Sequence, residues 1–114
     1  MVKEITVGNL PLKLKSTAGT ALFYKRTFRK ELLKEVTEAS IEDLGVIECV
    51  QKLAFIMAMQ GESTPTQKML ELTEVDFLLW LDGFDSEDFQ NVDVIFSVLG
   101  VWNKSIAASV NEKN

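Results

Sequence analysis

The residues of this chain that are best suited to chemistry are a single cysteine and a cluster of carboxylates, and the chain contains no histidine. The absence of histidine removes the commonest general base, the commonest metal ligand and the base of Ser–His and Cys–His pairs. The glycines are scattered singly, so no Gly-rich phosphate-binding loop is present. We therefore predict that the protein is not an enzyme and that it has no catalytic residues and no cofactor.

Cys49 lies in the segment IECVQKLAFIMAM, where apolar residues recur at helical spacing. A thiol becomes reactive when positive charge lies nearby, and only Lys52 is close in sequence. We therefore predict a buried thiol that packs as a small hydrophobic side chain.

A cluster of four carboxylates within seven residues can in principle hold calcium or magnesium: Asp82, Asp85, Glu87 and Asp88. A calcium loop of the EF-hand type needs oxygen ligands at alternate positions before its turn glycine, whereas Gly83 here precedes most of the acids. We predict no metal site. The acids instead suit the start of a helix, with Asp85 or Ser86 as the N-cap and the following acids in the first turn.

The N-terminal segment KEITVGNLPLKLK predicts a β-hairpin. Gly8-Asn9 suits a two-residue turn that needs a positive φ, and apolar residues alternate on both sides of it. With this turn, the facing pairs are Val7 with Leu10, Ile5 with Leu12, and Lys3 with Leu14. Nearly every apolar side chain then falls on one face, which must be covered by the helices that follow or by another chain.

The rest of the chain predicts helices, so the expected fold class is mainly α (α+β), an N-terminal β-hairpin followed by a compact bundle of about four to six helices. Residues 18–27 and 29–37 predict either one bent helix or two. A central helix is expected from a capping box at Ser40-Ile41-Glu42-Asp43 to Gly61, which we assign as its C-terminal cap.

After a loop that ends at Pro65, helix is expected to resume near Thr66. Thr73 can act as an N-cap, so residues 68–72 and 74–82 predict two helices or one interrupted helix. Apolar residues from Val92 to Ile106 predict a final amphipathic helix.

Composition predicts one domain. At 114 residues and 46% hydrophobic content the chain can bury one modest core, so we expect a single domain over residues 1–110 and a polar tail over residues 111–114. The longest apolar run, Leu53 to Met59, is far shorter than the roughly 20 residues of a membrane-spanning helix. Met1-Val2-Lys3-Glu4 does not open a signal peptide, so we expect a cytoplasmic protein without a membrane partner.

Charge is divided unevenly along the chain. Residues 1–36 carry eight Lys or Arg against three Glu, a net charge of +5, whereas residues 37–114 carry four against fourteen acids, a net charge of −10. Such a division favours head-to-tail self-association or recruitment of a basic partner, and equally describes ordinary solvated helix faces. Because the whole chain is acidic, we predict no nucleic-acid binding.

Ten aromatic residues are many for a domain of this size, so we expect some rings to be exposed for partner binding. The stripe Phe77, Trp80 or Leu81, and Phe84 has two readings: packing against the central helix, or an apolar groove that holds an amphipathic helix of another protein. Our predicted partner-binding residues are Tyr24, Phe28, Trp80, Phe84 and Trp102.

The order and spacing of several segments resemble the tail assembly chaperones of long-tailed phages and prophages of Gram-positive bacteria. The matching residues are Thr17-Ala18-Gly19-Thr20-Ala21-Leu22, Tyr24-Lys25, Phe28, Lys30-Glu31-Leu32-Leu33-Lys34 and Trp80-Leu81-Asp82-Gly83-Phe84-Asp85. Family members often carry Gly at the position of Arg29 and Pro at that of Ala21, so we expect a softer helix break here.

The resemblance implies a protein of the bacterial host cytoplasm, absent from the mature virion, that binds the phage tape-measure protein and keeps it soluble. It is displaced as major tail protein subunits polymerise, and no chemical step is involved. The resemblance also implies a longer form, made by ribosomal frameshifting, that recruits the major tail protein. The codons for Glu112-Lys113-Asn114 can spell a slippery heptamer, which leads us to hypothesise that this is the short form. The competing interpretation is an acidic helical regulator or adaptor that sequesters another protein. A third is a structural part of the finished tail.

Overall fold

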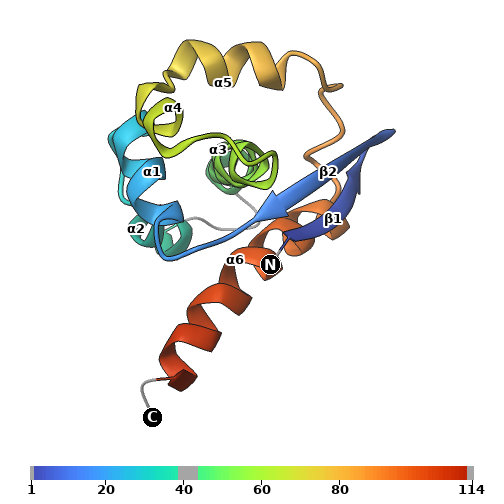
Figure 1. Ribbon diagram of the computed structural model, residues 1–114. Coiled ribbons are helices and arrows are strands. Elements are labelled where there is room, and N and C mark those ends of the chain that lie inside the picture. The colour runs from blue at the N-terminus through green and yellow to red at the C-terminus, as the bar shows by residue number, and fades with distance from the viewer. Residues whose placement is uncertain (1, 39–43, 113–114) are drawn as a thin grey trace.

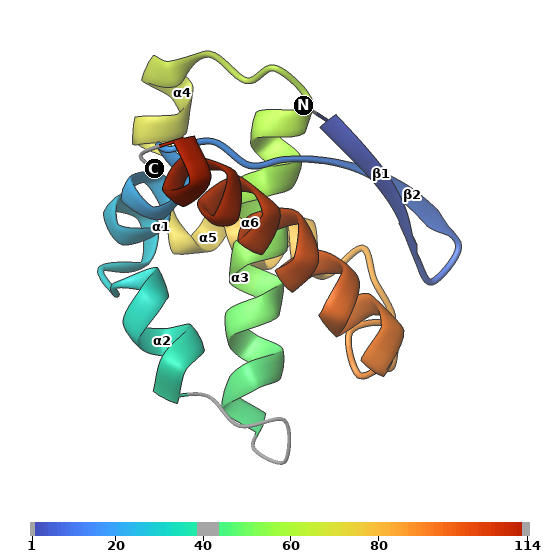
Figure 2. The same cartoon turned by 90° about the horizontal axis from the view of Figure 1, so that it is seen from below.

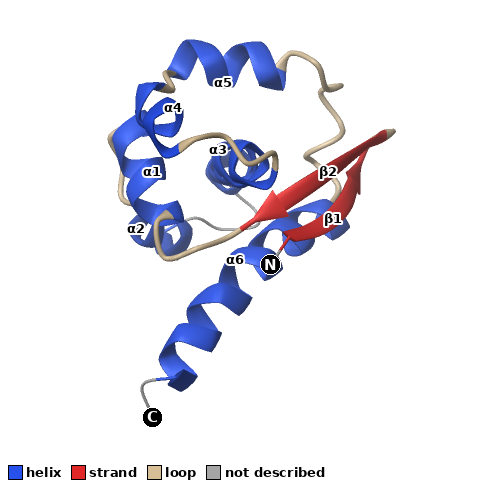
Figure 3. Cartoon of the chain, in the orientation of Figure 1, coloured by secondary structure: helices blue, strands red, loops and turns tan. Residues whose placement is uncertain are grey.

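The computed structural model describes residues 2–38 and 44–112 (Figure 1). It confirms the predicted fold class, because an N-terminal β-hairpin precedes a compact set of helices (Figure 3). The elements are β1 (Val2–Val7), β2 (Leu10–Lys15), α1 (Thr20–Phe28), α2 (Leu32–Glu38), α3 (Leu44–Gly61), α4 (Thr66–Glu71), α5 (Glu74–Leu81) and α6 (Val92–Glu112).

The hairpin has the predicted register, with Val7 opposite Leu10, Ile5 opposite Leu12 and Lys3 opposite Leu14. Gly8 takes a φ of 61° and Asn9 does not have a positive φ, which is the type II′ arrangement of a two-residue turn. Pro11 pairs with Thr6, a position between the hydrogen-bonded pairs, where its missing N–H costs no ladder bond. The apolar face is covered by the protein's own helices, since Ile5, Val7 and Leu14 are buried.

α3 is the central helix, as predicted. It packs against β2, α1, α2, α5 and α6, and Figure 2 shows α6 crossing over it. Because neighbours surround it, every residue from Lys52 to Ala58 is buried. The capping box predicted at residues 40–43 lies outside the described residues.

The prediction that Gly61 caps the C-terminal end of α3 is wrong. Ser63, with a φ of 61°, holds the left-handed position, and its N–H donates to the Gln60 carbonyl while the Thr64 N–H donates to the Met59 carbonyl. These two bonds form a Schellman motif. Gly61 is the last helical residue and serves close packing instead, because a Cβ there would lie 1.9 Å from the Lys13 carbonyl oxygen of β2.

A turn between the hairpin and α1 is fixed on the end of α3 by Gln60. The Gln60 amide donates to Thr17 Oγ1 at 3.0 Å and its carbonyl oxygen accepts from Thr20 Oγ1 at 2.7 Å. Within the turn, the Thr17 N–H donates to Thr20 Oγ1. The two threonines of the resemblance segment therefore hold the hairpin, α1 and α3 together.

The segment after this turn forms two helices, which settles the alternative left open by the sequence. Arg29 ends α1 with φ and ψ of 57° and 33°, and its N–H donates to the Lys25 carbonyl. This is the left-handed helix end that glycine usually occupies. The expectation of a softer break is therefore wrong, because arginine takes the glycine conformation.

Replacing Arg29 by glycine is expected to raise the free energy of unfolding by about 0.5–1 kcal/mol, because glycine reaches a positive φ without a Cβ clash. The matched control is Arg26→Gly, in the regular part of α1, where glycine should cost about 1 kcal/mol. Denaturant unfolding measures both. A destabilised Arg29→Gly variant would show that its side chain contributes more than the strained backbone costs.

Two separate helices also follow Pro65. Thr73 caps α5 through a capping box with Asp76, in which each residue's side chain accepts the other's backbone N–H. α6 begins at Val92, as predicted, and Asn91 Oδ1 accepts the Asp93 N–H at 2.8 Å. The predicted helix start with Asp85 or Ser86 as the N-cap is wrong, because residues 86–90 form turns. Of the acidic cluster, Asp88 accepts the Asp85 N–H instead of starting a helix.

Candidate functional site

The outer face of α5 carries three large apolar side chains that are exposed to solvent. Val75, Leu78 and Leu79 are 64%, 59% and 72% exposed. Residues three and four apart lie on one side of a helix, so these three side chains form one continuous surface, which we call the α5 ridge. Glu74 and Asp82, both exposed, lie at its two ends.

The inner face of α5 is equally apolar and belongs to the core. Phe77 is buried, and its ring lies 5.1 Å from the Phe28 ring and 5.6 Å from the Phe55 ring. Trp80 packs on Phe55 at 5.5 Å, and Leu81 also packs against the core. A helix that is apolar all round is normally buried all round, so the exposed outer face of α5 is the unusual feature.

A hollow between α1 and α4 combines apolar and basic side chains. It has a volume of about 910 Å³ and is lined by Leu22, Leu70, Lys25, Arg26 and Arg29; we call it the basic groove. Both leucines are exposed, at 66% and 44%. With leucines and cations side by side, this groove suits a partner surface that is apolar and flanked by acidic side chains.

A second, smaller hollow of about 250 Å³ connects the ridge with the end of α1. Leu78 of the ridge lines it together with Phe28, Phe77 and Lys30. Lys30 follows Arg29 of the basic groove in the chain, and the lining of the smaller hollow is of mixed charge, because Glu48, Lys52 and Glu74 also line it. The ridge and the groove therefore lie on neighbouring parts of the molecule.

The expectation of exposed rings is wrong for three of the five predicted partner-binding residues. Tyr24, Phe28 and Trp102 are 0%, 6% and 4% exposed, because each projects from its helix toward the core around α3. Trp80 and Phe84 are partly buried, with ring centroids 4.8 Å apart, and pack against the core. The stripe on α5 therefore packs against the central helix.

Partner contact stays a prediction for Trp80 and Phe84. Trp80 lines a third hollow of about 530 Å³, which lies between β2 and the end of α3 and is also lined by Leu12, Lys13 and Gly61. A partner side chain that enters this hollow would reach the Trp80 ring.

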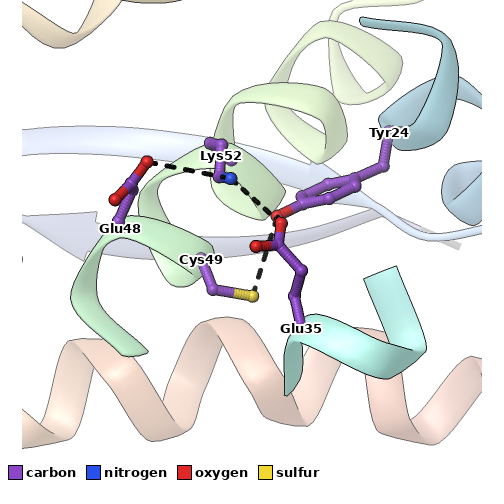
Figure 4. Close-up of polar contacts among 5 residues, drawn as sticks. All are labelled: Tyr24, Glu35, Glu48, Cys49 and Lys52. Atoms are coloured by element: carbon purple, nitrogen blue, oxygen red, sulfur yellow. Dashed lines mark hydrogen bonds and ion pairs between the residues drawn. The ribbon is translucent and has the colours of Figure 1, made fainter. Parts of the chain in front are cut away.

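A buried polar network joins α1, α2 and α3 (Figure 4). Lys52 Nζ lies 2.9 Å from Glu35 Oε1, and the Tyr24 hydroxyl donates to the same carboxylate oxygen. Lys52 is 7% exposed and its ammonium lies 5.5 Å and 5.4 Å from the ring centres of Tyr24 and Phe28, within cation–π range. The network attaches α2 to the rest of the protein.

The network also sets the protonation of its members. Burial raises the pKa of the Tyr24 phenol far above its ordinary value, and the hydrogen bond to Glu35 adds to this rise. Burial acts to raise the pKa of Glu35 as well, but the hydrogen bonds from Tyr24 and Lys52 outweigh it, so the pKa lies below its ordinary value. Burial also raises the pKa of Cys49, which keeps this thiol protonated at neutral pH.

No group of three or more potential metal ligands comes together within residues 2–38 and 44–112. The same part of the chain contains no helix with the length and hydropathy needed to cross a membrane. Asp88 instead lies against the hairpin turn, where a Cβ on Gly8 would meet its carboxylate at 2.5 Å.

The α5 ridge is absent from the residues singled out by sequence reasoning, although a signal for it exists. From Glu74 to Leu81 every position except Glu74 and Asp76 is apolar. A helix of this composition has more apolar surface than one core contact can cover. The aromatic stripe, the stronger signal in the sequence, is the inner face of the helix.

Comparisons of the chain with models of protein families, with curated proteins and with solved structures found no match.

Proposed function

We propose that this chain is a tail assembly chaperone, which holds amphipathic helices of the phage tape-measure protein on its α5 ridge. The exposed outer face of a helix that is apolar on both faces carries this proposal. The sequence resemblance supplies the identity of the client. Binding covers apolar surface on both proteins and needs no chemical step.

The size of the ridge fits a chaperone that must release its client. Three exposed aliphatic side chains form an anchor that is small compared with a standard protein interface of about 1,600 Å². One copy would therefore bind weakly, and many copies along a long client would together keep it soluble. Polymerising major tail protein can then displace the copies, in the host cytoplasm and without leaving them in the virion.

Replacing Leu78 and Leu79 together by serine is expected to lower affinity for tape-measure helices about tenfold or more, because both anchors are lost. Stability should change little, since both side chains are exposed. The measurement is the soluble yield of tape-measure fragments, from the same genome, co-expressed with each variant. The yield should fall toward that without chaperone.

The matched control replaces two exposed leucines on other elements, Leu10 and Leu33, by serine. This variant should solubilise the fragments as the wild-type protein does. Equal loss in both variants would mean that general surface hydrophobicity, not the α5 ridge, holds the client. Unchanged solubility with the ridge variant would contradict the proposal.

A further inference from the structure

The α5 ridge and the basic groove are complementary in chemistry. The ridge presents Val75, Leu78 and Leu79 between two acids, whereas the groove presents two leucines among three cations. Each surface is a different part of the same chain. A second copy therefore carries a surface that suits each of them.

We propose that, without client, the α5 ridge of one copy docks into the basic groove of a second copy. The leucines Leu22 and Leu70 of the groove would receive the apolar side chains of the ridge. Arg26 and Arg29 would face the acids Glu74 and Asp82 at its ends. Docking covers apolar surface that would otherwise expose the free protein to non-specific association.

The charges of the groove are available for such a partner. Within the described residues, Lys25 forms an ion pair with Glu31 at 3.6 Å, whereas neither Arg26 nor Arg29 forms one. Both arginines are exposed. On the ridge side, Glu74 and Asp82 are likewise exposed and without an ion pair in this part of the chain.

The proposed contact regulates the client site, because the same ridge cannot hold a client and a second copy at once. This regulatory part rests on the proposed function, whereas self-docking stands on the two surfaces alone. The contact is smaller than a standard interface, so the dissociation constant should be on the order of 100 µM. A client helix can then displace the second copy without a separate release step.

The experiment is sedimentation velocity of the full chain over a range of concentrations up to the millimolar level. The wild-type protein should self-associate, and added salt should weaken the association, because exposed charges are screened. For the groove variant, Arg26→Glu with Arg29→Glu, the dissociation constant of self-association should be at least about tenfold higher than that of the wild-type protein. A control with the same change of charge on the hairpin, Lys3→Glu with Lys13→Glu, should associate as the wild-type protein does.

Charge reversal on the ridge provides the sharper test. A ridge variant, Glu74→Arg with Asp82→Arg, should also fail to self-associate, but mixing it with the groove variant should restore association between the two. A wild-type protein that remains monomeric at every concentration would overturn the proposal, as would a groove variant that associates normally. A mixture that stays monomeric would also overturn it.

Client binding separates this inference from the proposed function. The groove variant keeps its ridge, so it should solubilise tape-measure fragments at least as well as the wild-type protein. If self-association behaves as described but no fragment is solubilised by any variant, the self-docking stands and the chaperone function fails. If fragments are solubilised but the wild-type protein remains monomeric, only the self-docking fails.

Discussion

Alanine at position 61 is expected to lower the free energy of unfolding by about 3 kcal/mol or more, the range of severe overpacking. A Cβ on Gly61 would lie 1.9 Å from the Lys13 carbonyl oxygen and 2.6 Å from its carbon. Both are backbone atoms of β2, so no side-chain rotation relieves the contact. Strand and helix must separate, which also disturbs the buried Leu14 next to Lys13.

Gly100 of α6 offers a matched control for this substitution. A Cβ there would meet no atom within 4 Å, so Gly100→Ala should raise stability by about 0.5–1 kcal/mol through helix propensity. Denaturant unfolding measures the free energy of unfolding of both variants. The same methyl group is added in each, at position 61 against the backbone of β2 and at position 100 where it meets no other atom. A Gly61→Ala variant as stable as the wild-type protein would contradict the close packing of α3 on β2.

Replacing Lys52 by alanine is expected to cost about 3 kcal/mol, the lower end of the range for breaking a buried ion pair. The lower end applies because the Glu35 side chain is 27% exposed, while that of Lys52 is only 9% exposed. The variant leaves the Glu35 carboxylate with the Tyr24 hydroxyl but without its cation, and it removes the ammonium that lies over the Tyr24 and Phe28 rings. α2 should loosen first.

The exposed Lys68 of α4 is the control, since Lys68→Ala should change stability by less than about 0.5 kcal/mol. Lys52→Met retains the packing of the stem and separates the loss of charge from the loss of contacts. A cost of Lys52→Ala no larger than that of Lys68→Ala would show that the network does not attach α2.

The pH dependence of the Lys52→Ala effect gives a second check. The pKa of Glu35 is lowered in the folded protein, so its pairing stabilises the protein above the pKa of the unfolded chain, about 4.3. This contribution is lost as the pH falls through the lower, folded pKa. The stability difference between wild-type protein and Lys52→Ala should therefore be largest at neutral pH and fall in acid to the part that comes from the lost packing of the Lys52 side chain.

The fold was largely predictable because its main signals are local. The hairpin register follows from alternation around Gly8-Asn9, and the central helix follows from apolar residues at helical spacing. The position of the Thr73 cap was also readable from its capping-box spacing. These features depend on neighbouring residues, which the sequence displays directly.

Features set by contacts between distant segments were not predictable. Gly61 looks like a helix cap in sequence, and only the passage of β2 beside it reveals its packing role. The arginine at position 29 gives no signal of its own for a left-handed conformation, and only the glycine that the resembled family often carries there points to one; after Arg29, α2 folds back against α1 and α3. Tyr24, Phe28 and Trp102 are buried, although the number of aromatic residues predicts exposed rings. The composition gives the number of rings but not how many of them the core can hold.

The residues of the resemblance have a structural role in this protein. Thr17 and Thr20 bond to Gln60, and Tyr24, Phe28 and Leu32 are buried. The motif therefore describes how the fold is held together more than where a partner binds. The α5 ridge lies just before the resemblance segment that begins at Trp80, on the opposite side of the helix from the Trp80 side chain.

The most direct test of the chaperone account is to map binding by NMR, with isotope-labelled protein titrated with helical fragments of the tape-measure protein from the same genome. We expect amide shift changes over Glu74–Leu81 and in Lys30, which lines the hollow beside Leu78, and we expect them to be absent in the Leu78→Ser, Leu79→Ser variant. Changes confined to the hairpin and to the exposed Val92 and Phe96 of α6 would contradict the ridge as the client site. Binding to none of the fragments would contradict the chaperone function and favour the regulator.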